Sequence, residues 1–240
     1  MPSVFKICFY YITDRAAFPG DDRTRRLRLL DKISEAASHG VDYIQLREKD
    51  LPTCELERLA RDAMSIIREV RTIGQDRQCA LLINSRTDVA LAADANGVHL
   101  QADDVSPEEV RAAWSHGKSG EGACFDEIRA GSDGKKSTPD PLIAVSCHSL
   151  REVTQAAANR ATFAVFAPVF EKKGFPATRA AGLDALGEAS LVKIPVLALG
   201  GVSLQNAHSC LRAGAAGIAA IRLFQENDIA TIVEQLRGQK

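Results

Sequence analysis

The feature that most constrains this chain is a regular alternation between short apolar runs and longer amphipathic runs. Such an alternation predicts strands joined by helical crossovers, and therefore a parallel sheet. Helical patterns cover residues 24–39, 51–73, 106–114 and 203–214 among others. The runs that read as buried strands are VFKICFYYIT (4–13), VDYIQL (41–46), CALLIN (79–84), GVHL (97–100), LIAVSC (142–147), FAVFAP (163–168), PVLALG (195–200) and GIAAI (217–221).

This rhythm favours a closed (β/α)8 TIM barrel, whose usual length of about 250 residues is close to the length of this chain. The structural rival is an open doubly wound sheet, which needs a glycine-rich turn after its first strand. Here the first strand is followed by TDRAAFPG (13–20), which contains no such turn. We therefore expect a single TIM-barrel domain over residues 1–240.

One segment breaks the rhythm. Residues 117–141, GKSGEGACFDEIRAGSDGKKSTPDP, are rich in Gly, Ser, Asp and Lys and only weakly periodic. This composition predicts a flexible insertion between the fourth helix and the fifth strand. In a barrel that connection lies on the face opposite the carboxyl ends of the strands.

Charge and cysteine content exclude several classes of function. Thirty basic and 31 acidic residues give a net charge of -1, so no overall field attracts nucleic acid or an anionic membrane. No apolar run approaches the roughly 18 residues that a membrane span needs. The six cysteines form no C-x-x-C pair, which fits a reduced cytoplasmic protein. The sequence leaves open whether the chain forms a homodimer.

Polar side chains follow the predicted strands where each one ends. In the extended run YIQLREKDL (43–51), period-two alternation puts Gln45, Arg47 and Lys49 on one face. The carboxyl ends of barrel strands meet at one mouth, so a site is expected there, although a solvated strand exit is the alternative. Cations, carboxylates and glycines together indicate bound phosphates and Mg2+. Further candidates at strand ends are Asn84, Ser85, Arg86, Asp103, Asp104, Ser146, His148, Lys172, Lys173, Gly200, Gly201 and Ser203.

Five segments resemble the thiamine phosphate synthase family, in the same order and at similar spacing. The distinctive pair is QLREK (45–49) followed by N-x-R-x-D-x-A (84–90), whereas a GG after a strand occurs in many phosphate-binding barrels. The segments are YIQLREKDL (43–51), LLINSRTDVALAADANGVHLQADD (81–104), VSCHS (145–149), FAPVFEKKG (166–174) and PVLALGGVSLQNAHSCLRAGAAGIAAI (195–221).

The resemblance implies a TIM-barrel transferase with two phosphorylated small-molecule substrates. Members of this family join 4-amino-2-methyl-5-hydroxymethylpyrimidine diphosphate to 4-methyl-5-(2-phosphoethyl)thiazole, giving thiamine phosphate and diphosphate. The implied reaction is dissociative: diphosphate leaves first, and the thiazole nitrogen then captures the pyrimidine cation. The implied cofactor is Mg2+.

The same resemblance implies roles for individual residues. On the pyrimidine diphosphate side they are Gln45, Arg47, Glu48, Lys49, Asn84 and Ser146, of which Arg47, Lys49 and Ser146 are the expected catalytic residues. On the thiazole phosphate side they are Lys172, Lys173, Gly200, Gly201, Ile221 and Arg222.

The chain departs from the family pattern at the expected metal site. The family has Asn-Asp where this chain has Asn84 and Ser85, so Asp104 is left as the main carboxylate, with Ser85 beside it. Asp103 or Asp88 could replace the missing carboxylate. A Thr-x-Thr-Lys sequence after the sixth strand is absent as well, which puts more weight on Lys172, Lys173 and Arg222. The family's usual glycine after the fourth strand is missing too, and the sequence offers no role for Gln101.

Two other functions stay open. The first is a thiazole tautomerase of the same fold, in which a histidine such as His148 transfers protons. The second is a non-catalytic binder of thiamine precursors. The retained QLREK segment favours the synthase, because a tautomerase substrate has no diphosphate. His99 is interpreted as a positioned strand residue and not as a metal ligand.

Overall fold

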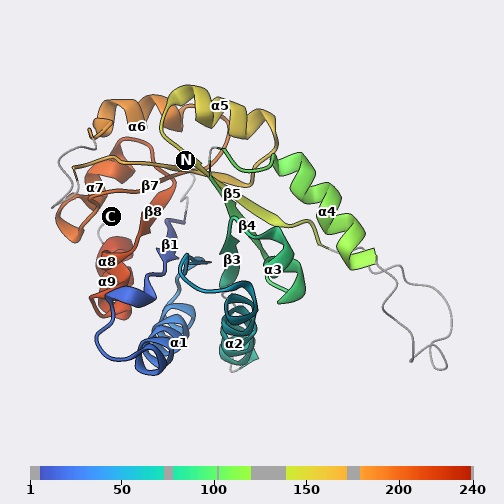
Figure 1. The fold of residues 1–240 in the computed structure, drawn as a ribbon. Coiled ribbons are helices and arrows are strands. Elements are labelled where there is room, and N and C mark those ends of the chain that lie inside the picture. The colour runs from blue at the N-terminus through green and yellow to red at the C-terminus, as the bar shows by residue number, and fades with distance from the viewer. Residues whose placement is uncertain (1–5, 73–77, 102, 120–138, 172–178, 239–240) are drawn as a thin grey trace.

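The barrel predicted from the sequence is present. The structure is a computed structural model that describes residues 6–72, 78–101, 103–119, 139–171 and 179–238. Its strands are β1 (Cys8–Ile12), β2 (Tyr43–Leu46), β3 (Ala80–Asn84), β4 (Gly97–Leu100), β5 (Leu142–Cys147), β6 (Phe163–Phe166), β7 (Val196–Ala198) and β8 (Gly217–Ala220). Each strand pairs in parallel with the next, and β8 pairs with β1 to close the sheet (Figure 1).

Helices surround the barrel and connect its strands (Figure 1). A short 3-10 helix, η1 (Arg15–Ala17), follows β1. The α-helices are α1 (Asp22–Ser38), α2 (Thr53–Thr72), α3 (Thr87–Ala92), α4 (Pro107–Ser119), α5 (Leu150–Ala158), α6 (Gly182–Ser190), α7 (Leu204–Arg212), α8 (Arg222–Gln225) and α9 (Ile229–Gly238). Within the described ranges, no helix combines the length and the apolar character needed to cross a membrane.

The predicted insertion starts inside a helix. Helix α4 continues to Ser119, past the expected end at residue 114, and β5 begins at Leu142. A capping box sets the start of α4: the Ser106 N–H donates to the Glu109 carboxylate at 2.7 Å, and the Glu109 N–H donates to Ser106 Oγ at 3.3 Å. Residues 120–138 of the insertion lie outside the described residues.

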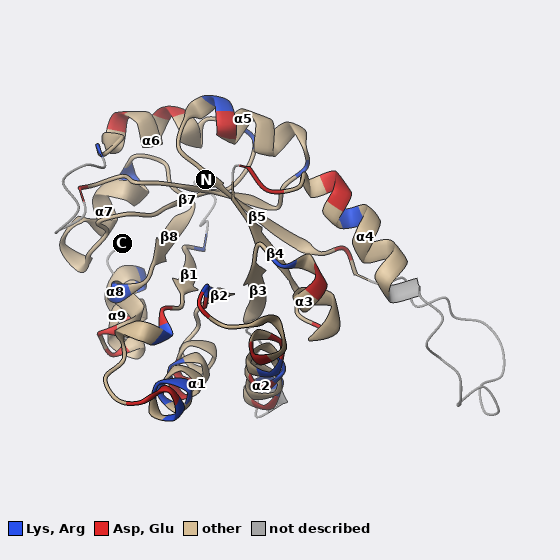
Figure 2. Cartoon of the chain, in the orientation of Figure 1, with Lys and Arg blue, Asp and Glu red and all other residues tan. Residues whose placement is uncertain are grey.

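Two apolar layers hold the barrel together. The inner layer fills the barrel and contains Tyr10, Leu82, Phe163, Val165 and Leu197 among others. The outer layer lies between the strands and the helices, and it contains the alternate strand residues together with the buried helix faces. Charged residues occur mostly in the helices and loops, while the strands are almost free of them (Figure 2). The mouth loops therefore carry the charges that a site needs.

Candidate active site

The charged residues after β2 lie at the mouth but not on the strand. Because β2 ends at Leu46, Arg47 and Lys49 belong to the loop that follows, with Arg47 half-buried and Lys49 exposed. Gln45 lies one layer deeper, almost fully buried, and its Nε2 donates to the Tyr10 hydroxyl at 3.2 Å. Gln45 faces the barrel interior, and the charge of Arg47 acts on His99, which is buried there too.

Glu48 anchors this loop. Its Oε1 accepts from the Thr13 hydroxyl at 2.5 Å and its Oε2 accepts from the Arg15 N–H at 2.9 Å. Thr13 Oγ1 in turn accepts from the Arg47 N–H at 3.0 Å. Both oxygens of Glu48 are therefore committed within the protein, which argues against the direct substrate contact expected from the sequence.

The anchor is a buried carboxylate with incomplete charge compensation. Burial raises the pKa of Glu48 to about 7, against the hydrogen bonds from Thr13 and Arg15 and the charge of Arg15. The Arg15 guanidinium is itself buried, but it pairs with Asp22 and with Asp50 and lies 4.0 Å from Glu48. The loops after β1 and β2 are thereby tied to each other.

A second polar cluster joins the ends of β3 and β4. The Ser85 hydroxyl donates to Asp104 Oδ2 at 2.7 Å, and the Gln101 N–H donates to the same oxygen at 2.7 Å. The side-chain amides of Gln101 and Asn84 donate to Ser85 Oγ at 3.1 and 3.3 Å. Gln101, which had no role in the sequence analysis, therefore orients the hydroxyl that stands in place of a carboxylate. Ser85 adopts φ 56°, a left-handed conformation that Asn and Asp also tolerate.

The donor set of this cluster fits Mg2+ weakly. Asp104 supplies one carboxylate, and Ser85 and Gln101 supply neutral oxygens. No group of three or more His, Cys, Asp or Glu side chains suited to a metal occurs in the part of the chain that the structure describes. Mg2+ commonly binds one or two carboxylates and takes its other ligands from water and substrate phosphates. The cluster is compatible with such an ion when a diphosphate supplies further oxygens.

Ser146 lies at the end of β5 and shares a hydrogen bond with a side chain inside the barrel. Its Oγ lies 2.7 Å from His99 Nε2. Burial, reinforced by the nearby charge of Arg47, lowers the pKa of His99 to about 3, so the imidazole is neutral at physiological pH. His99 is a positioned strand residue, as its sequence context indicates.

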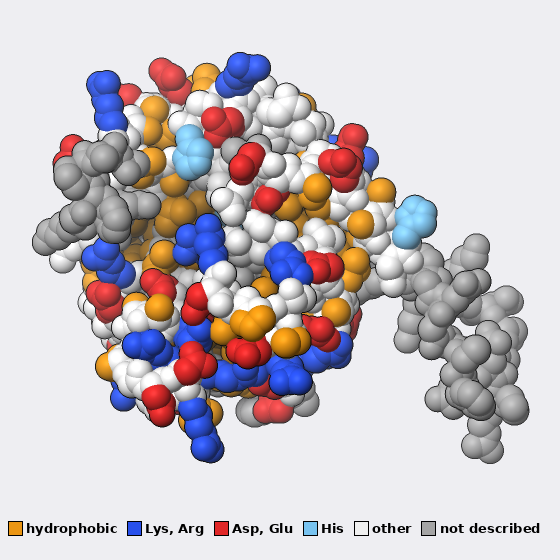
Figure 3. All heavy atoms as spheres, in the orientation of Figure 1, with side chains coloured by type: hydrophobic (Ala, Val, Ile, Leu, Met, Phe, Trp, Pro, Cys, Tyr) orange, Lys and Arg blue, Asp and Glu red, His pale blue; other side chains and the backbone are white. Residues whose placement is uncertain are grey.

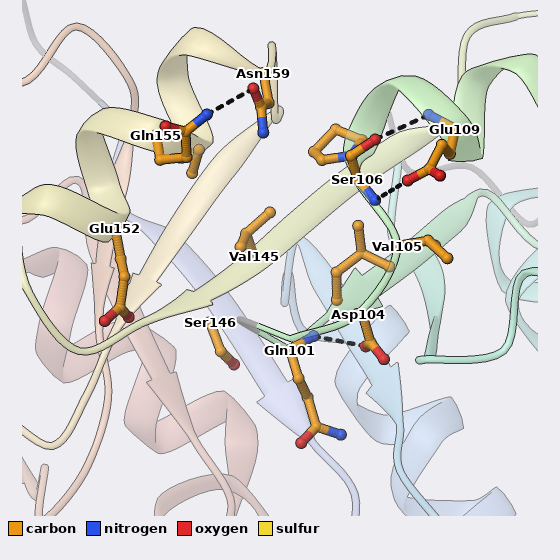
Figure 4. Close-up of a pocket in the computed structure, with 13 residues that line it drawn as sticks. Gln101, Asp104, Val105, Ser106, Glu109, Val145, Ser146, Glu152, Gln155 and Asn159 are labelled. Carbon is orange, nitrogen blue, oxygen red and sulfur yellow. Dashed lines mark hydrogen bonds between the residues drawn. The ribbon is translucent and has the colours of Figure 1, made fainter.

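A cavity of about 310 Å³ opens beside these residues. It is lined by the ends of β4 and β5, the first turn of α4 and one side of α5 along its length to Asn159, and it includes Gln101, Asp104 and Ser146 (Figure 4). On one face of the molecule, hydrophobic side chains gather left of the centre of the view, with basic side chains, acidic side chains and a histidine around them (Figure 3).

The glycines after β7 are required by close packing. Gly200 and Gly201 have φ of 96° and 65°. A Cβ on Gly201 would lie 2.8 Å from both Glu171 O and Phe170 Cβ, and one on Gly200 would lie 2.7 Å from Pro168 Cα. The loop after β7 therefore packs directly on the segment after β6.

A second cavity, of about 220 Å³, adjoins this loop. Ser203 and Gln205 line it from the start of α7, and Arg222 lines it from the start of α8. Ile221 is the residue that precedes α8. The start of α7 and Arg222 bring positive charge to this cavity, and Glu226 lines it with a negative charge. Lys172 and Lys173, which were expected near this point, lie outside the described residues.

His148, the residue that a tautomerase would use, is exposed at the end of β5. The ring Nδ1 of His148 lies 2.7 Å from Ala167 O, and the backbone N–H of His148 donates to the Glu152 carboxylate at 2.6 Å. Since a carbonyl oxygen only accepts, Nδ1 carries the proton. The ring is thus oriented by β6, next to the mouth.

Comparison with known proteins decides the family. The family model described as thiamine monophosphate synthase matches residues 9–119 and 126–224, which is most of the chain. The chain belongs to the thiamine monophosphate synthase family. The resemblance that the sequence motifs indicated is confirmed, and it extends over both the mouth loops and the barrel strands.

Relatives agree with this assignment. A thiamine-phosphate synthase of Roseiflexus sp. (strain RS-1) is 34% identical over 214 residues, which cover 88% of this chain and 75% of that protein. A thiamine-phosphate synthase of Pyrococcus furiosus is 30% identical over 234 residues, which cover 97% and 94%. The solved structure of the thiamine phosphate pyrophosphorylase from Pyrococcus furiosus superposes with a TM-score of 0.71 at 28% identity, covering 98% of this chain and 95% of that one.

The sequence analysis did not identify the residues of β1 and the loop after it that hydrogen-bond to the site residues. Tyr10 and Thr13 bond to Gln45, Arg47 and Glu48. Alternation along the first strand could have indicated Tyr10, because it shares a face with Cys8 and Ile12, which also belong to the inner layer. The pairing of Thr13 with Glu48 joins residues 35 positions apart and has no local signature.

Proposed function

We propose that this protein is a thiamine phosphate synthase, a transferase that joins the pyrimidine diphosphate to the thiazole phosphate and releases diphosphate. The observation that carries the proposal is the position of Arg47 and Lys49 just beyond β2 in a chain of this family. The cysteines in the described part of the chain are free, which is in keeping with the proposed cytoplasmic location.

The first step breaks the bond between the methylene carbon of the pyrimidine and the diphosphate oxygen. The electron pair leaves with diphosphate, so negative charge grows on that oxygen. Arg47 and Lys49 stabilise this charge, and fixed donors of this kind are usually the largest contribution in such a reaction. Glu48 and Thr13 act indirectly, because they hold the backbone from which both cations extend.

The pyrimidine rests on Asn84 and Ser146. The Oδ1 of Asn84 is the acceptor for the exocyclic amino group, and Ser146 contacts the ring. The apolar residues around the mouth keep water from the cation until the thiazole nitrogen donates its lone pair and forms the new C–N bond.

Asp104 and Ser85, with Gln101 beside them, would hold Mg2+. When bound, the ion neutralises part of the charge that leaves with diphosphate. With one carboxylate in place of two, the affinity of the protein alone for Mg2+ is expected to be low, and the substrate diphosphate completes the ligand set.

The thiazole phosphate fits the cavity between α7 and α8. Gly201 allows close approach to the backbone, Arg222 supplies charge, and Ile221 borders the site. Gly200 is buried beneath this loop. Lys172 or Lys173 would add a cation from the segment after β6.

Product formation by wild type, Arg47→Ala and Arg58→Ala tests this proposal. Arg58 is exposed on α2 and serves as the matched control. Wild type and Arg58→Ala are expected to form thiamine phosphate equally. Arg47→Ala is expected to lose about 100-fold or more in kcat, with an unchanged melting temperature. Equal rates for all three proteins would refute the role of Arg47, and no product from folded wild type would refute the function.

A further inference from the structure

A chain of hydrogen bonds crosses the inside of the barrel and ends at Ser146. Gln45 Nε2 donates to the Tyr10 hydroxyl at 3.2 Å. The Tyr10 hydroxyl lies 3.0 Å from His99 Nδ1, and His99 Nε2 lies 2.7 Å from Ser146 Oγ. The first three side chains are almost completely buried. They come from β2, β1 and β4, so only the closed barrel brings them together.

With Gln45 Nε2 as the donor, one direction along this chain gives the buried Tyr10 proton an acceptor. A tyrosine hydroxyl has one proton, and because Tyr10 accepts from Gln45 it can give that proton to His99 Nδ1. A neutral imidazole has one N–H. With Nδ1 acting as the acceptor, that N–H is on Nε2 and donates to Ser146 Oγ. Ser146 Oγ thus accepts a hydrogen bond from His99 inside the barrel, and its own hydroxyl proton points away from His99.

We propose that His99 is a positioning residue that holds the Ser146 hydroxyl as a hydrogen-bond donor toward the mouth. The proposal rests on the proposed function, in which Ser146 contacts the pyrimidine. It assigns a polarity to that contact: Ser146 donates, and a ring nitrogen accepts.

The side-chain amide of Asn84 supplies a hydrogen-bond acceptor beside the Ser146 donor. Asn84 pairs with His99 in the register of β3 and β4, so it lies on the same side of the mouth. Its Nδ2 donates to Ser85 Oγ at 3.3 Å, which leaves Oδ1 as the acceptor. An acceptor beside a donor matches an amino group next to a ring nitrogen, which is the edge of a 4-aminopyrimidine. The hydrogen-bond chain therefore contributes to the choice of substrate.

The tautomer of His99 can be measured without any turnover. In protein labelled with 15N-histidine, long-range 1H–15N correlation spectra distinguish Nε2–H from Nδ1–H, and the spectrum of His99→Gln identifies the signals that belong to His99. The expected result is Nε2–H, unchanged between pH 5.5 and 8. Tyr10→Phe removes the donor to Nδ1 and should populate both tautomers. An Nδ1–H tautomer in wild type would overturn the proposed direction.

Steady-state kinetics test the consequence for the substrate. His99→Leu is expected to lower kcat/KM for the pyrimidine diphosphate about 10- to 100-fold, because a polar contact is lost, while KM for the thiazole phosphate stays unchanged. His99→Gln can donate from nearly the same position and should restore most of the loss.

His116, which is exposed on α4 and bonded to its own helix, provides the control His116→Leu with wild-type kinetics. An unchanged kcat/KM in folded His99→Leu overturns the positioning role. Absence of product from wild type would refute the proposed function instead, and the spectra would still decide the proton direction.

Discussion

Replacing Thr13 by Val tests how the loop after β2 is held. Thr13 is fully buried, and its hydroxyl donates to the Glu48 carboxylate and accepts from the Arg47 N–H. Valine has nearly the same shape, so the substitution removes both hydrogen bonds and leaves little change in packing. A buried carboxylate and a part-buried N–H then lose a partner each.

The expected cost follows from those two losses. A hydrogen bond to a charged group contributes about 1.5–3 kcal/mol, and a buried N–H without a partner costs about 1–3 kcal/mol. The two effects share one side chain and are not additive, so we expect Thr13→Val to lower the free energy of unfolding by about 2–4 kcal/mol.

The cost should depend on pH in a defined direction. Burial raises the pKa of Glu48 from 4.5 to about 7 in the folded protein. Its contribution to stability is therefore greatest below pH 4.5 and falls as the pH rises to about 7. The hydrogen bond from Thr13 favours the charged form of Glu48. Removing this bond therefore lowers the free energy of unfolding most above pH 7, where Glu48 is charged. Thr13→Val should destabilise the protein more at pH 8 than at pH 5.5.

Urea denaturation at both pH values measures this difference. The matched control is Thr154→Val, because Thr154 is exposed and its hydroxyl bonds only to Leu150 O of its own helix. We expect the control to change stability by less than about 0.5 kcal/mol. A loss for Thr13→Val as small as that of the control, or one that is equal at the two pH values, would refute the anchoring role of Thr13 and Glu48.

Two further predictions concern the metal site and the insertion. Ser85→Asp places a second carboxylate next to Asp104, so calorimetric titration of the protein alone should show tighter Mg2+ binding than in wild type. The control Ser85→Asn should not bind Mg2+ more tightly. Equal Mg2+ affinities of Ser85→Asp and wild type would exclude Ser85 from the site. Deletion of residues 120–138 should leave kcat and KM unchanged. These residues connect the end of α4 to the start of β5, whereas the site residues follow the carboxyl ends of the strands. A large loss of turnover would mean that this segment reaches the mouth.

The fold could be predicted because its signal is local. Every barrel strand lies within an apolar run visible in the sequence, and the helices between them follow amphipathic patterns with recognisable starts, such as Ser106 and Glu109. The end of β2 could not be predicted, since YIQL and the charged residues after it can all be drawn as one extended run. The structure ends β2 at Leu46, so Arg47 and Lys49 lie in the loop and not on the strand.

The supporting contacts could not be predicted, because they depend on closure of the barrel. His99 lies 89 positions from Tyr10 and 47 from Ser146. Alternation along β4 indicates that His99 faces inward, but not which groups it meets there. Glu48 likewise looked like part of a charged loop, and only its contacts with Thr13 and Arg15 identify it as an anchor.

The most direct test of the function is one incubation of the two substrates with folded protein, followed by mass spectrometry for thiamine phosphate and 31P NMR for diphosphate. With Mg2+ the proposal predicts both products in equal amounts, and with EDTA it predicts neither. Folded protein that forms no thiamine phosphate in the presence of Mg2+ would contradict it, and His148→Ala would then be the first variant to test for a tautomerase.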